Sequence, residues 1–185
     1  MKELFGEYIS ILYHDIPPYL YEGLLSVFCL GVVLLVAWKG IKTGLRYTAV
    51  LLLIEYVFLL FCSTVVIRRI SETRRYDFHP FWSYKAILEG RVELLPENIM
   101  NVVVFMPVGI LLGSLLRGNG AWRKAILIGL GISVSIEVLQ FILHRGFSEL
   151  DDVMHNTLGC MIGYGVYSLV RYGYERFGKR PEEIC

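Results

Sequence analysis

The sequence predicts an all-α fold, namely a polytopic integral membrane bundle of about five transmembrane helices with an interfacial helix at the N-terminus. Hydrophobic residues make up 55% of the chain, and the mean hydropathy is +0.55. The 17 acidic and 18 basic residues fall mostly between apolar stretches. Several of these stretches approach the roughly 20 residues with which a helix crosses the hydrocarbon core. Five spans leave little of the 185 residues for a soluble module, so we expect one membrane domain over residues 1–185.

The N-terminal segment is expected to lie on the membrane surface. Apolar residues within 4–12 recur at helical spacing until Pro17 and Pro18 end the pattern, which is typical of a short interfacial helix. Glu3 and Glu7 stand where a secretory signal peptide would carry basic residues. No cleaved signal is therefore expected.

The apolar stretches follow one another along the chain, with charged residues between them. The last is the shortest and contains three glycines, but we still expect it to cross the membrane. The five predicted spans are residues 19–38, 47–67, 99–116, 125–143 and 154–170.

The distribution of lysine and arginine predicts the orientation, because short cytoplasmic segments are enriched in both. With five spans, one side of the membrane collects ten basic residues in two short loops and the C-terminal tail. The other side has eight, mostly in one long loop. The denser set should be cytoplasmic, which places the N-terminus outside and the C-terminus in the cytoplasm, although Arg68 and Arg69 after the second span favour the opposite orientation. The ten are Lys39, Lys42, Arg46, Arg117, Arg123, Lys124, Arg171, Arg176, Lys179 and Arg180.

One carboxylate lies where lipid would be expected, because Glu137 is inside the apolar run 125–143. A charge at membrane depth is costly, so such a residue usually has an internal partner and a function. Gln140 follows three residues later, the segment 144–152 is rich in charge, and the next apolar run begins near His155 and Asn156. Polar groups therefore gather where two spans meet one face of the membrane.

Helical spacing places the polar residues of three spans on matching faces. The third predicted span contributes Asn98 and Asn101, and Pro107 is expected to interrupt this helix and free a backbone carbonyl. Two further stripes run along the fourth and fifth spans, and the polar ends of all three should meet. The stripes are Gly129, Ser133, Glu137, Gln140 and His144, and Asp152, Asn156, Gly159 and Gly163.

Two interpretations of this cluster stay open. In the first, it is a satisfied polar network that fixes helix register. Glu137 lies about 10 Å below the outer boundary at the rise of an α-helix, with Arg145 as its expected partner and Asn101 or Asn156 as alternatives. In the second, the cluster binds a polar headgroup or performs acid–base chemistry. Asp151 and Asp152 also suit the N-terminus of the fifth span, where negative charge is favourable.

Metal binding and nucleophilic catalysis are not expected. Asp151 and His155 are four residues apart and share a helix face, but no second histidine has suitable spacing. The four cysteines are scattered, and buried structural thiols explain them best. No Ser-His-Asp arrangement can be argued from spacing, and we expect neither a cofactor nor a nucleic-acid partner.

The long loop between the second and third spans, residues 68–97, is not simply hydrophilic. Aromatic residues surround Pro80 within 78–84, and aromatic side chains favour the headgroup level of a membrane. The loop is therefore either an interfacial anchor, a lid over the polar cluster, or both.

Several motifs together resemble the VanZ-like family over about residues 78–164. The resemblance implies a membrane protein related to an accessory protein of glycopeptide resistance, associated with teicoplanin rather than with cell-wall precursor remodelling. The matching residues that it singles out are Asn101, Pro107, Glu137, Gln140, Arg145, Asp151, Asp152 and Asn156. The motifs run from Asn101 to Gly109, from Ser135 to Gln140, through Arg145 and Asp151-Asp152 to Asn156-Thr157-Leu158-Gly159 and Gly163-Tyr164, with His79-Pro80-Phe81 before them.

Two classes of function follow from these observations. The favoured one is a non-enzymatic binder in the bacterial cell membrane, whose partners are membrane lipids and a lipid-linked or lipoglycopeptide molecule at the outer leaflet. The aromatic loop would hold the acyl part, and Arg145 with the amide side chains would hold polar groups. The alternative is a membrane-embedded enzyme that acts on a lipid headgroup, with Glu137 as general acid or base.

Overall fold

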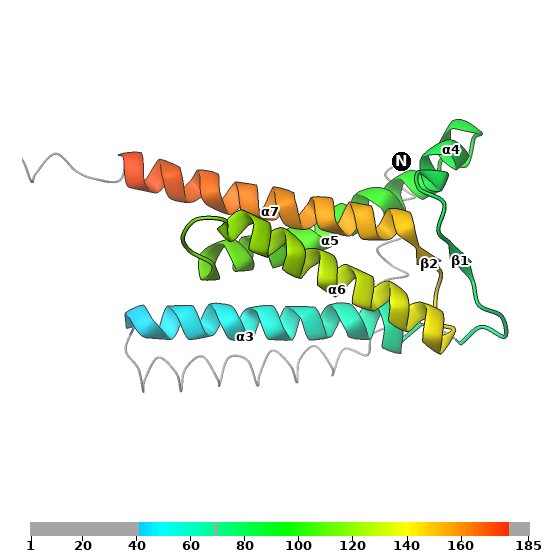
Figure 1. Ribbon diagram of the computed structural model, residues 1–185, viewed down its shortest axis with the longest axis horizontal. Helices are drawn as coiled ribbons and strands as arrows, with labels where there is room; N and C mark the ends of the chain where they lie inside the picture. The colour runs from blue at the N-terminus through cyan, green and yellow to red at the C-terminus, as the bar shows by residue number, and fades with distance from the viewer. Residues whose placement is uncertain (1–40, 69, 178–185) are drawn as a thin grey trace, which may run out of the picture.

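The computed structural model describes residues 41–68 and 70–177. The interfacial helix expected at 4–12 and the first predicted span, 19–38, lie outside the described residues. Within them, four long helices run side by side along one axis (Figure 1). They are α3 (Ile41–Phe61), which continues into the π-helix η1 (Cys62–Val66), α5 (Leu94–Leu115), α6 (Ala121–Leu143) and α7 (Leu150–Phe177). The all-α bundle expected from the sequence is confirmed.

Three of the described helical segments are long and apolar enough to cross a membrane, namely Arg46–Val66, Leu94–Leu115 and Ala121–Leu143. They contain nearly all of the second, third and fourth predicted spans. The fifth predicted span lies in α7, which has 28 residues and is not among these three. The protein is therefore an integral membrane protein by its described helices, and five passes stay a prediction.

Helices α5 and α7 pack against each other most extensively, and glycines make this possible. A Cβ atom built at Gly159 would lie 2.1 Å from the carbonyl oxygen of Val102, and one at Gly163 would lie 2.0 Å from that of Met106. Neither position can accept a larger residue without separating the helices. Close backbone approach at small residues is a common way for helices to associate in membranes.

The apolar core lies between α5, α6 and α7, where Phe105, Val108, Ala125, Ile136 and Cys160 are almost completely buried. Pro107 was expected to interrupt the third span, and this expectation is wrong. Helix α5 continues from Leu94 to Leu115 with Pro107 inside it, because neighbouring helices hold both halves in line. The Tyr56 hydroxyl of α3 donates to the carbonyl of Val104 at 2.7 Å, which adds a polar contact near the proline.

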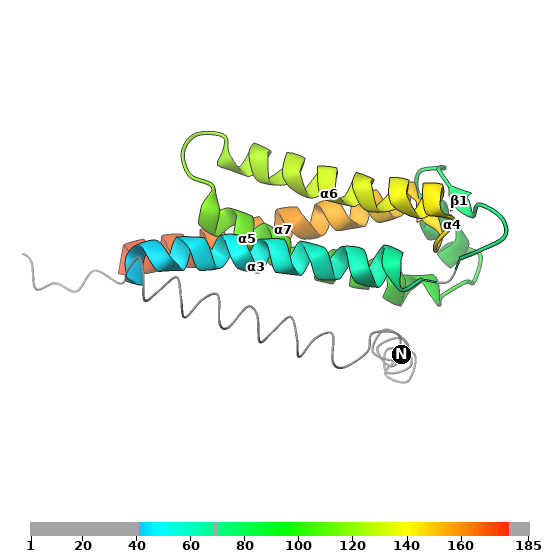
Figure 2. The same cartoon turned by 90° about the horizontal axis from the view of Figure 1, so that it is seen from below.

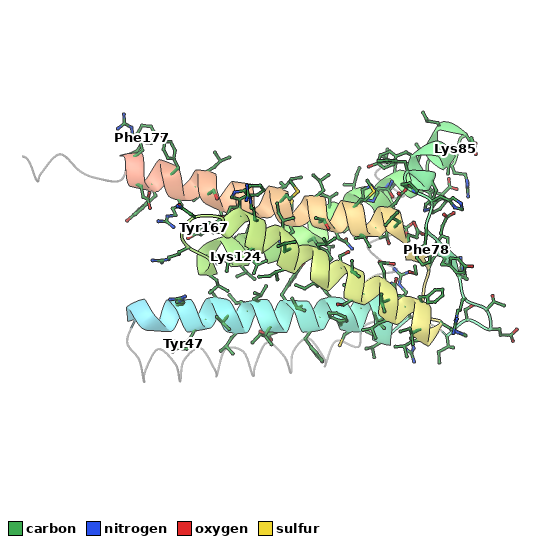
Figure 3. All side chains as sticks on the ribbon, in the orientation of Figure 1. Tyr47, Phe78, Lys85, Lys124, Tyr167 and Phe177 are labelled. Carbon is green, nitrogen blue, oxygen red and sulfur yellow. The ribbon has the colours of Figure 1, made fainter. Side chains whose placement is uncertain are left out.

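The short elements gather at one end of the bundle, where α6 ends and α7 begins (Figure 2). Strand β1 (Tyr76–Asp77) pairs in parallel with β2 (Ser148–Glu149), so that Tyr76 is opposite Ser148. Helix α4 (Trp82–Leu88) follows β1. We call this the polar end. Phe78 and Lys85 lie there, whereas Lys124 and Tyr167 lie at the opposite end, which we call the basic end (Figure 3).

Candidate functional site

The carboxylate of Glu137 is buried in the last turns of α6, with a residue exposure of 6%. Its Oε2 atom accepts a hydrogen bond from the backbone N–H of Glu149 at 2.8 Å, and the Ser148 side chain also bonds to it. The chain can return to Glu137 because α6 ends at His144 in a left-handed conformation and Gly146 also has a positive φ. The carboxylate therefore holds the segment that follows its own helix.

Glu149 is the second buried carboxylate at the polar end, and it lies in β2, outside the predicted spans. Its Oε2 accepts a hydrogen bond from the Trp82 indole at 3.1 Å. Burial raises the pKa of Glu149 to about 9, and the nearby carboxylates of Asp152, Glu97 and Glu137 raise it further, while the indole bond opposes the shift. Glu149 is therefore protonated at neutral pH.

Asp151 has a structural role that the sequence did not indicate. We expected it to stabilise the N-terminus of its own helix, but its carboxylate caps α4 instead. It accepts hydrogen bonds from the backbone N–H groups of Phe81 at 2.6 Å and Ser83 at 2.9 Å, and from the Ser83 hydroxyl at 2.6 Å. The Asn98 amide then donates to the same hydroxyl at 3.1 Å. These bonds join α4, α5 and α7.

Two amide side chains cross-link the helices at the same end. Asn101 of α5 donates to Asp152 at 2.7 Å, and Asn156 of α7 donates to the Ser133 hydroxyl of α6 at 2.9 Å. Neither amide contacts Glu137 through a hydrogen bond. The polar stripes thus meet, with each residue bound to a different partner.

Arg145 was expected to pair with Glu137, and this expectation is wrong. Its guanidinium donates to the backbone carbonyls of Val65 and Val66 and, at 3.3 Å, to that of Arg68. The carbonyls of Val65 and Val66 lie at the end of η1, where backbone acceptors have no helical partner, and that of Arg68 lies just beyond it. Arg145 therefore caps that helix, and its charge compensates the helix dipole.

Gln140 and His155 each have one buried polar atom without a partner among the described residues. The Gln140 amide nitrogen donates to the carbonyl of Thr64 at 3.0 Å, which leaves its Oε1 free. The His155 Nε2 atom is 2.8 Å from the Tyr84 hydroxyl, which leaves Nδ1 free. Over the described ranges, no three His, Cys, Asp or Glu side chains are grouped as metal ligands would be.

The loop between η1 and α4 covers the polar end. Backbone hydrogen bonds join Ser71 to His144 at 2.8 Å and Ser148 to Arg75 at 3.1 Å. Aromatic contacts also join the loop to α6, and the ring centroids of Phe78 and Phe141 are 6.0 Å apart. The loop that the sequence suggested as anchor or lid therefore packs against the end of α6 and against β2.

A cavity of about 440 Å³ lies beside these two carboxylates, between α6, the start of α7 and Phe78. Glu137, Ser148 and Glu149 are among its lining residues, but the surface that faces the cavity is almost entirely apolar. Val134, Val138 and Ile142 of α6 line it and are partly exposed, at 41%, 47% and 57%. The cavity is therefore accessible from the outer face of α6. The remaining apolar lining residues are Phe78, Phe141, Leu150 and Val153.

Sequence reasoning missed several residues of this site. Ser148 and Glu149 belong to the charged segment after α6, but nothing in their spacing indicates that the chain turns back toward Glu137. Trp82 and Ser83 were noted only as part of an aromatic loop. Their proximity to Asp151 and Glu149 depends on contacts between residues about 70 positions apart.

Comparison with known proteins shows a family to which the chain is similar. The family model described as VanZ/LLP1 matches residues 47–171, which extends the resemblance found in the sequence to α3 and most of α7. The chain is similar to Protein VanZ of Enterococcus faecium, with 36% identity over 73 residues. The matched segment is 40% of this chain and 45% of that protein, so it spans less than half of the relative. No solved structure matches the chain significantly.

Proposed function

Because this chain belongs to the VanZ/LLP1 family, we propose that it acts in the bacterial cell envelope by binding a lipid, lipid-linked or lipoglycopeptide molecule at the outer leaflet. Through this binding it would contribute to resistance against teicoplanin and related lipoglycopeptides. The similarity to Protein VanZ supports the resistance association. The match covers under half of that relative, so the activity is proposed for this chain on the strength of its site.

The observation that carries the proposal is the cavity beside Glu137. It is lined mainly by aliphatic and aromatic side chains, and it is reached from the face of α6 that would contact lipid. Binding sites for small molecules are typically concave and apolar, with a few polar groups that fix orientation. An acyl chain matches the apolar lining, and the proposal places a polar group of the ligand at the edge of the cavity, near the buried side chains of Glu137, Ser148 and Glu149.

The polar groups near the cavity differ from those expected from the sequence. Arg145 and the amides of Asn101 and Asn156 are bound within the protein, so the proposal assigns the polar part of the ligand to the carboxyl groups. A carboxyl group that carries its proton donates one hydrogen bond, and its second oxygen accepts one. Hydroxyl, amide and amine groups therefore match these carboxyl groups better than phosphate does.

The proposal also includes the orientation, with the N-terminus outside and the C-terminus in the cytoplasm. This arrangement places the polar end and its cavity at the outer surface, where a lipoglycopeptide arrives. The basic end would then face the cytoplasm, in accordance with the distribution of Lys and Arg.

An enzymatic alternative remains, in which Glu137 serves as general acid or base on a lipid headgroup. The cavity beside a carboxyl pair favours it. Glu137→Gln distinguishes the two functions, because an enzyme would lose turnover while keeping ligand affinity. A binder would change only in affinity.

Drug susceptibility of a Gram-positive host that expresses the chain tests the proposal. We expect lower sensitivity to lipid-bearing glycopeptides and a smaller change for vancomycin, which lacks the acyl chain. Val138→Trp should remove this protection by filling the cavity. Leu127→Trp is the matched control, because Leu127 is 65% exposed on the same helix and does not line the cavity. Equal protection against both drugs would point to a change in their shared target and would contradict the proposal.

A further inference from the structure

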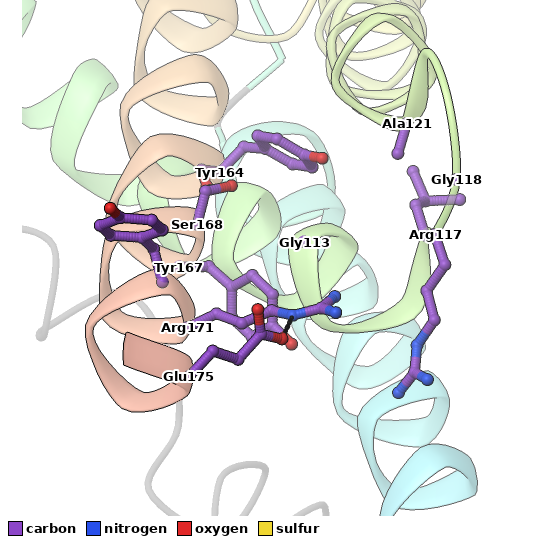
Figure 4. A pocket seen from close by; sticks show the side chains of 11 residues that line it. Gly113, Arg117, Gly118, Ala121, Tyr164, Tyr167, Ser168, Arg171 and Glu175 are labelled. Carbon is purple, nitrogen blue, oxygen red and sulfur yellow. Dashed lines mark hydrogen bonds and ion pairs between the residues drawn. The ribbon is translucent and has the colours of Figure 1, made fainter. Parts of the chain in front are cut away.

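The basic end of the bundle contains a second cavity, which the proposed function does not use. It has a volume of about 240 Å³ and lies between the C-terminal part of α7 and the loop that joins α5 to α6 (Figure 4). Gly113, Gly118 and Ala121 line it, and a Cβ atom built at Gly118 would have no neighbour within 4 Å. Gly118 has a φ of +88°, which glycine adopts without strain. The loop can therefore turn tightly around the opening.

Arginines from two elements flank this opening. Arg117 of the loop is exposed and forms no ion pair with the part of the chain that the structure describes. Arg171 extends from α7 into the opening (Figure 4), and its Nε lies 2.7 Å from Glu175 Oε1. The side chains of this pair are 47% and 59% exposed, so water screens their attraction. Both guanidinium groups are therefore available to an anion.

Hydroxyl and aromatic groups complete the lining and indicate its depth in a membrane. Tyr164, Tyr167 and Ser168 line the cavity, and Tyr172 at its edge is 65% exposed. Trp122, at the start of α6, is also half exposed. Exposed tyrosine and tryptophan near the ends of apolar helices are typical of the headgroup level. The cavity therefore lies where lipid headgroups would be.

The surrounding charge is positive. Arg123 and Lys124 lie on the first turn of α6, and Arg176 lies near the end of α7. Within residues 113–125 and 164–177, Glu175 is the one acidic residue. This end consequently attracts anions and disfavours cations.

We propose that this cavity binds the phosphate of an anionic phospholipid headgroup, with Arg117 and Arg171 as the binding residues. Guanidinium groups bind phosphate through paired charge-assisted hydrogen bonds. The volume is smaller than the roughly 300–1,000 Å³ of sites for drug-sized ligands, which suits a headgroup rather than a whole lipid. Leu169 and Val170 of α7, exposed at 72% and 67%, offer the adjoining acyl chains an apolar surface.

Native mass spectrometry of the full chain, incubated with equal amounts of phosphatidylglycerol and phosphatidylcholine, tests this assignment. We expect selective retention of phosphatidylglycerol, and an about tenfold loss of that retention in the double variant Arg117→Gln/Arg171→Gln. Arg123→Gln/Lys124→Gln removes the same charge from the same end, outside the cavity. Arg123 lies over the Trp122 ring, and this control should change retention by less than about twofold.

Glu175→Gln should increase lipid retention, which misfolding of the variant could not cause. The substitution removes the competing carboxylate from Arg171, so retention of phosphatidylglycerol should increase. A decrease in this variant, or an equal loss in the two double variants, would overturn the proposal. Inorganic phosphate at a comparable concentration should not displace the lipid, and displacement by it would overturn the lipid assignment in favour of a soluble phosphate. Thermal unfolding of each variant in detergent is the control for folding. An unchanged melting temperature shows that a loss of retention is a loss of lipid binding.

Discussion

The Glu137 carboxylate and the Glu149 backbone N–H are joined by a hydrogen bond of 2.8 Å, which ties the end of α6 to strand β2. Glu137 is thus partnered within the protein, as expected for an acid at membrane depth, but by a backbone group rather than by a basic side chain. Glu149 is also one of the residues that line the cavity. A residue that stabilises the fold therefore also shapes the proposed ligand site.

Glu137 and Arg145 should act independently in unfolding experiments. Arg145→Ala leaves three backbone carbonyls without their donor and should lower the free energy of unfolding by about 1–3 kcal/mol. Glu137→Gln should lower it less, because the glutamine keeps an acceptor for the Glu149 N–H. Since the two side chains share no partner, the double variant should equal the sum of the single variants within about 0.5 kcal/mol. A double-mutant cycle in detergent measures this. A coupling above about 1 kcal/mol would indicate a direct ion pair, contrary to the structure.

Among the carboxylates at the polar end, Asp151 should be the one whose substitution destabilises the fold most. Asp151→Asn replaces one acceptor oxygen by an amide that faces backbone donors at the start of α4, and we expect a loss of about 3 kcal/mol. Asp152→Asn is the matched control, because an asparagine there still accepts the bond from Asn101. Thermal unfolding of both variants measures this, and the melting temperature of Asp151→Asn should be the lower of the two. Equal melting temperatures would show that Asp151 does not hold α4 in place.

Stability should fall as the pH rises, and Glu149 is expected to contribute much of this decrease. Its pKa is raised from 4.5 to about 9, so the folded protein holds this proton more tightly than the unfolded chain does. The contribution to stability is fully present below about pH 4.5 and is lost as the pH rises through about 9. We expect the melting temperature in detergent to decrease between about pH 5 and pH 9.

Glu149→Gln should weaken this dependence, because a glutamine side chain stays neutral at every pH. Part of the dependence should persist, because burial raises the pKa of Asp152 to about 7. Glu89→Gln, an exposed position on the C-terminal side of α4, should leave it unchanged. A decrease of the same size in wild type and Glu149→Gln would assign the pH dependence to another group.

The orientation can be tested by labelling single cysteines in intact cells, in a chain from which the four native cysteines have been removed. Glu72 and Asn119 are both exposed and lie at opposite ends of the bundle. An impermeant reagent should label Glu72→Cys and should leave Asn119→Cys unmodified. Labelling of Asn119→Cys alone would mean that the bundle has the inverse orientation.

Periodicity and hydropathy were sufficient to predict the long helices and the burial of one face of α6. Ser133, Glu137 and Gln140 are all buried, as their spacing implied. These features depend on residues three or four apart, which a sequence displays directly. The helix break that we expected at Pro107 is absent. Packing against neighbouring helices offsets the cost of a proline inside a helix, and the sequence does not display this packing.

The partners of the polar residues could not be predicted. Arg145 is close to Glu137 in sequence and opposite in charge, yet it binds carbonyls of η1 that lie about 80 positions away. Asp151 likewise binds Ser83 across a separation of 68 residues. Such pairings depend on how the loops fold back over the helices. Hydrophobic periodicity carries no information about them.

The central claim is that the cavity beside Glu137 holds the acyl chain of its ligand. Binding of teicoplanin and of vancomycin to the purified full chain in lipid nanodiscs, with empty nanodiscs as blank, tests it most directly. We predict that the protein binds teicoplanin more tightly than vancomycin, that Val138→Trp weakens teicoplanin binding about tenfold or more, and that Leu127→Trp leaves it unchanged. Equal affinity for the two drugs, or teicoplanin binding unaffected by Val138→Trp, would contradict the account.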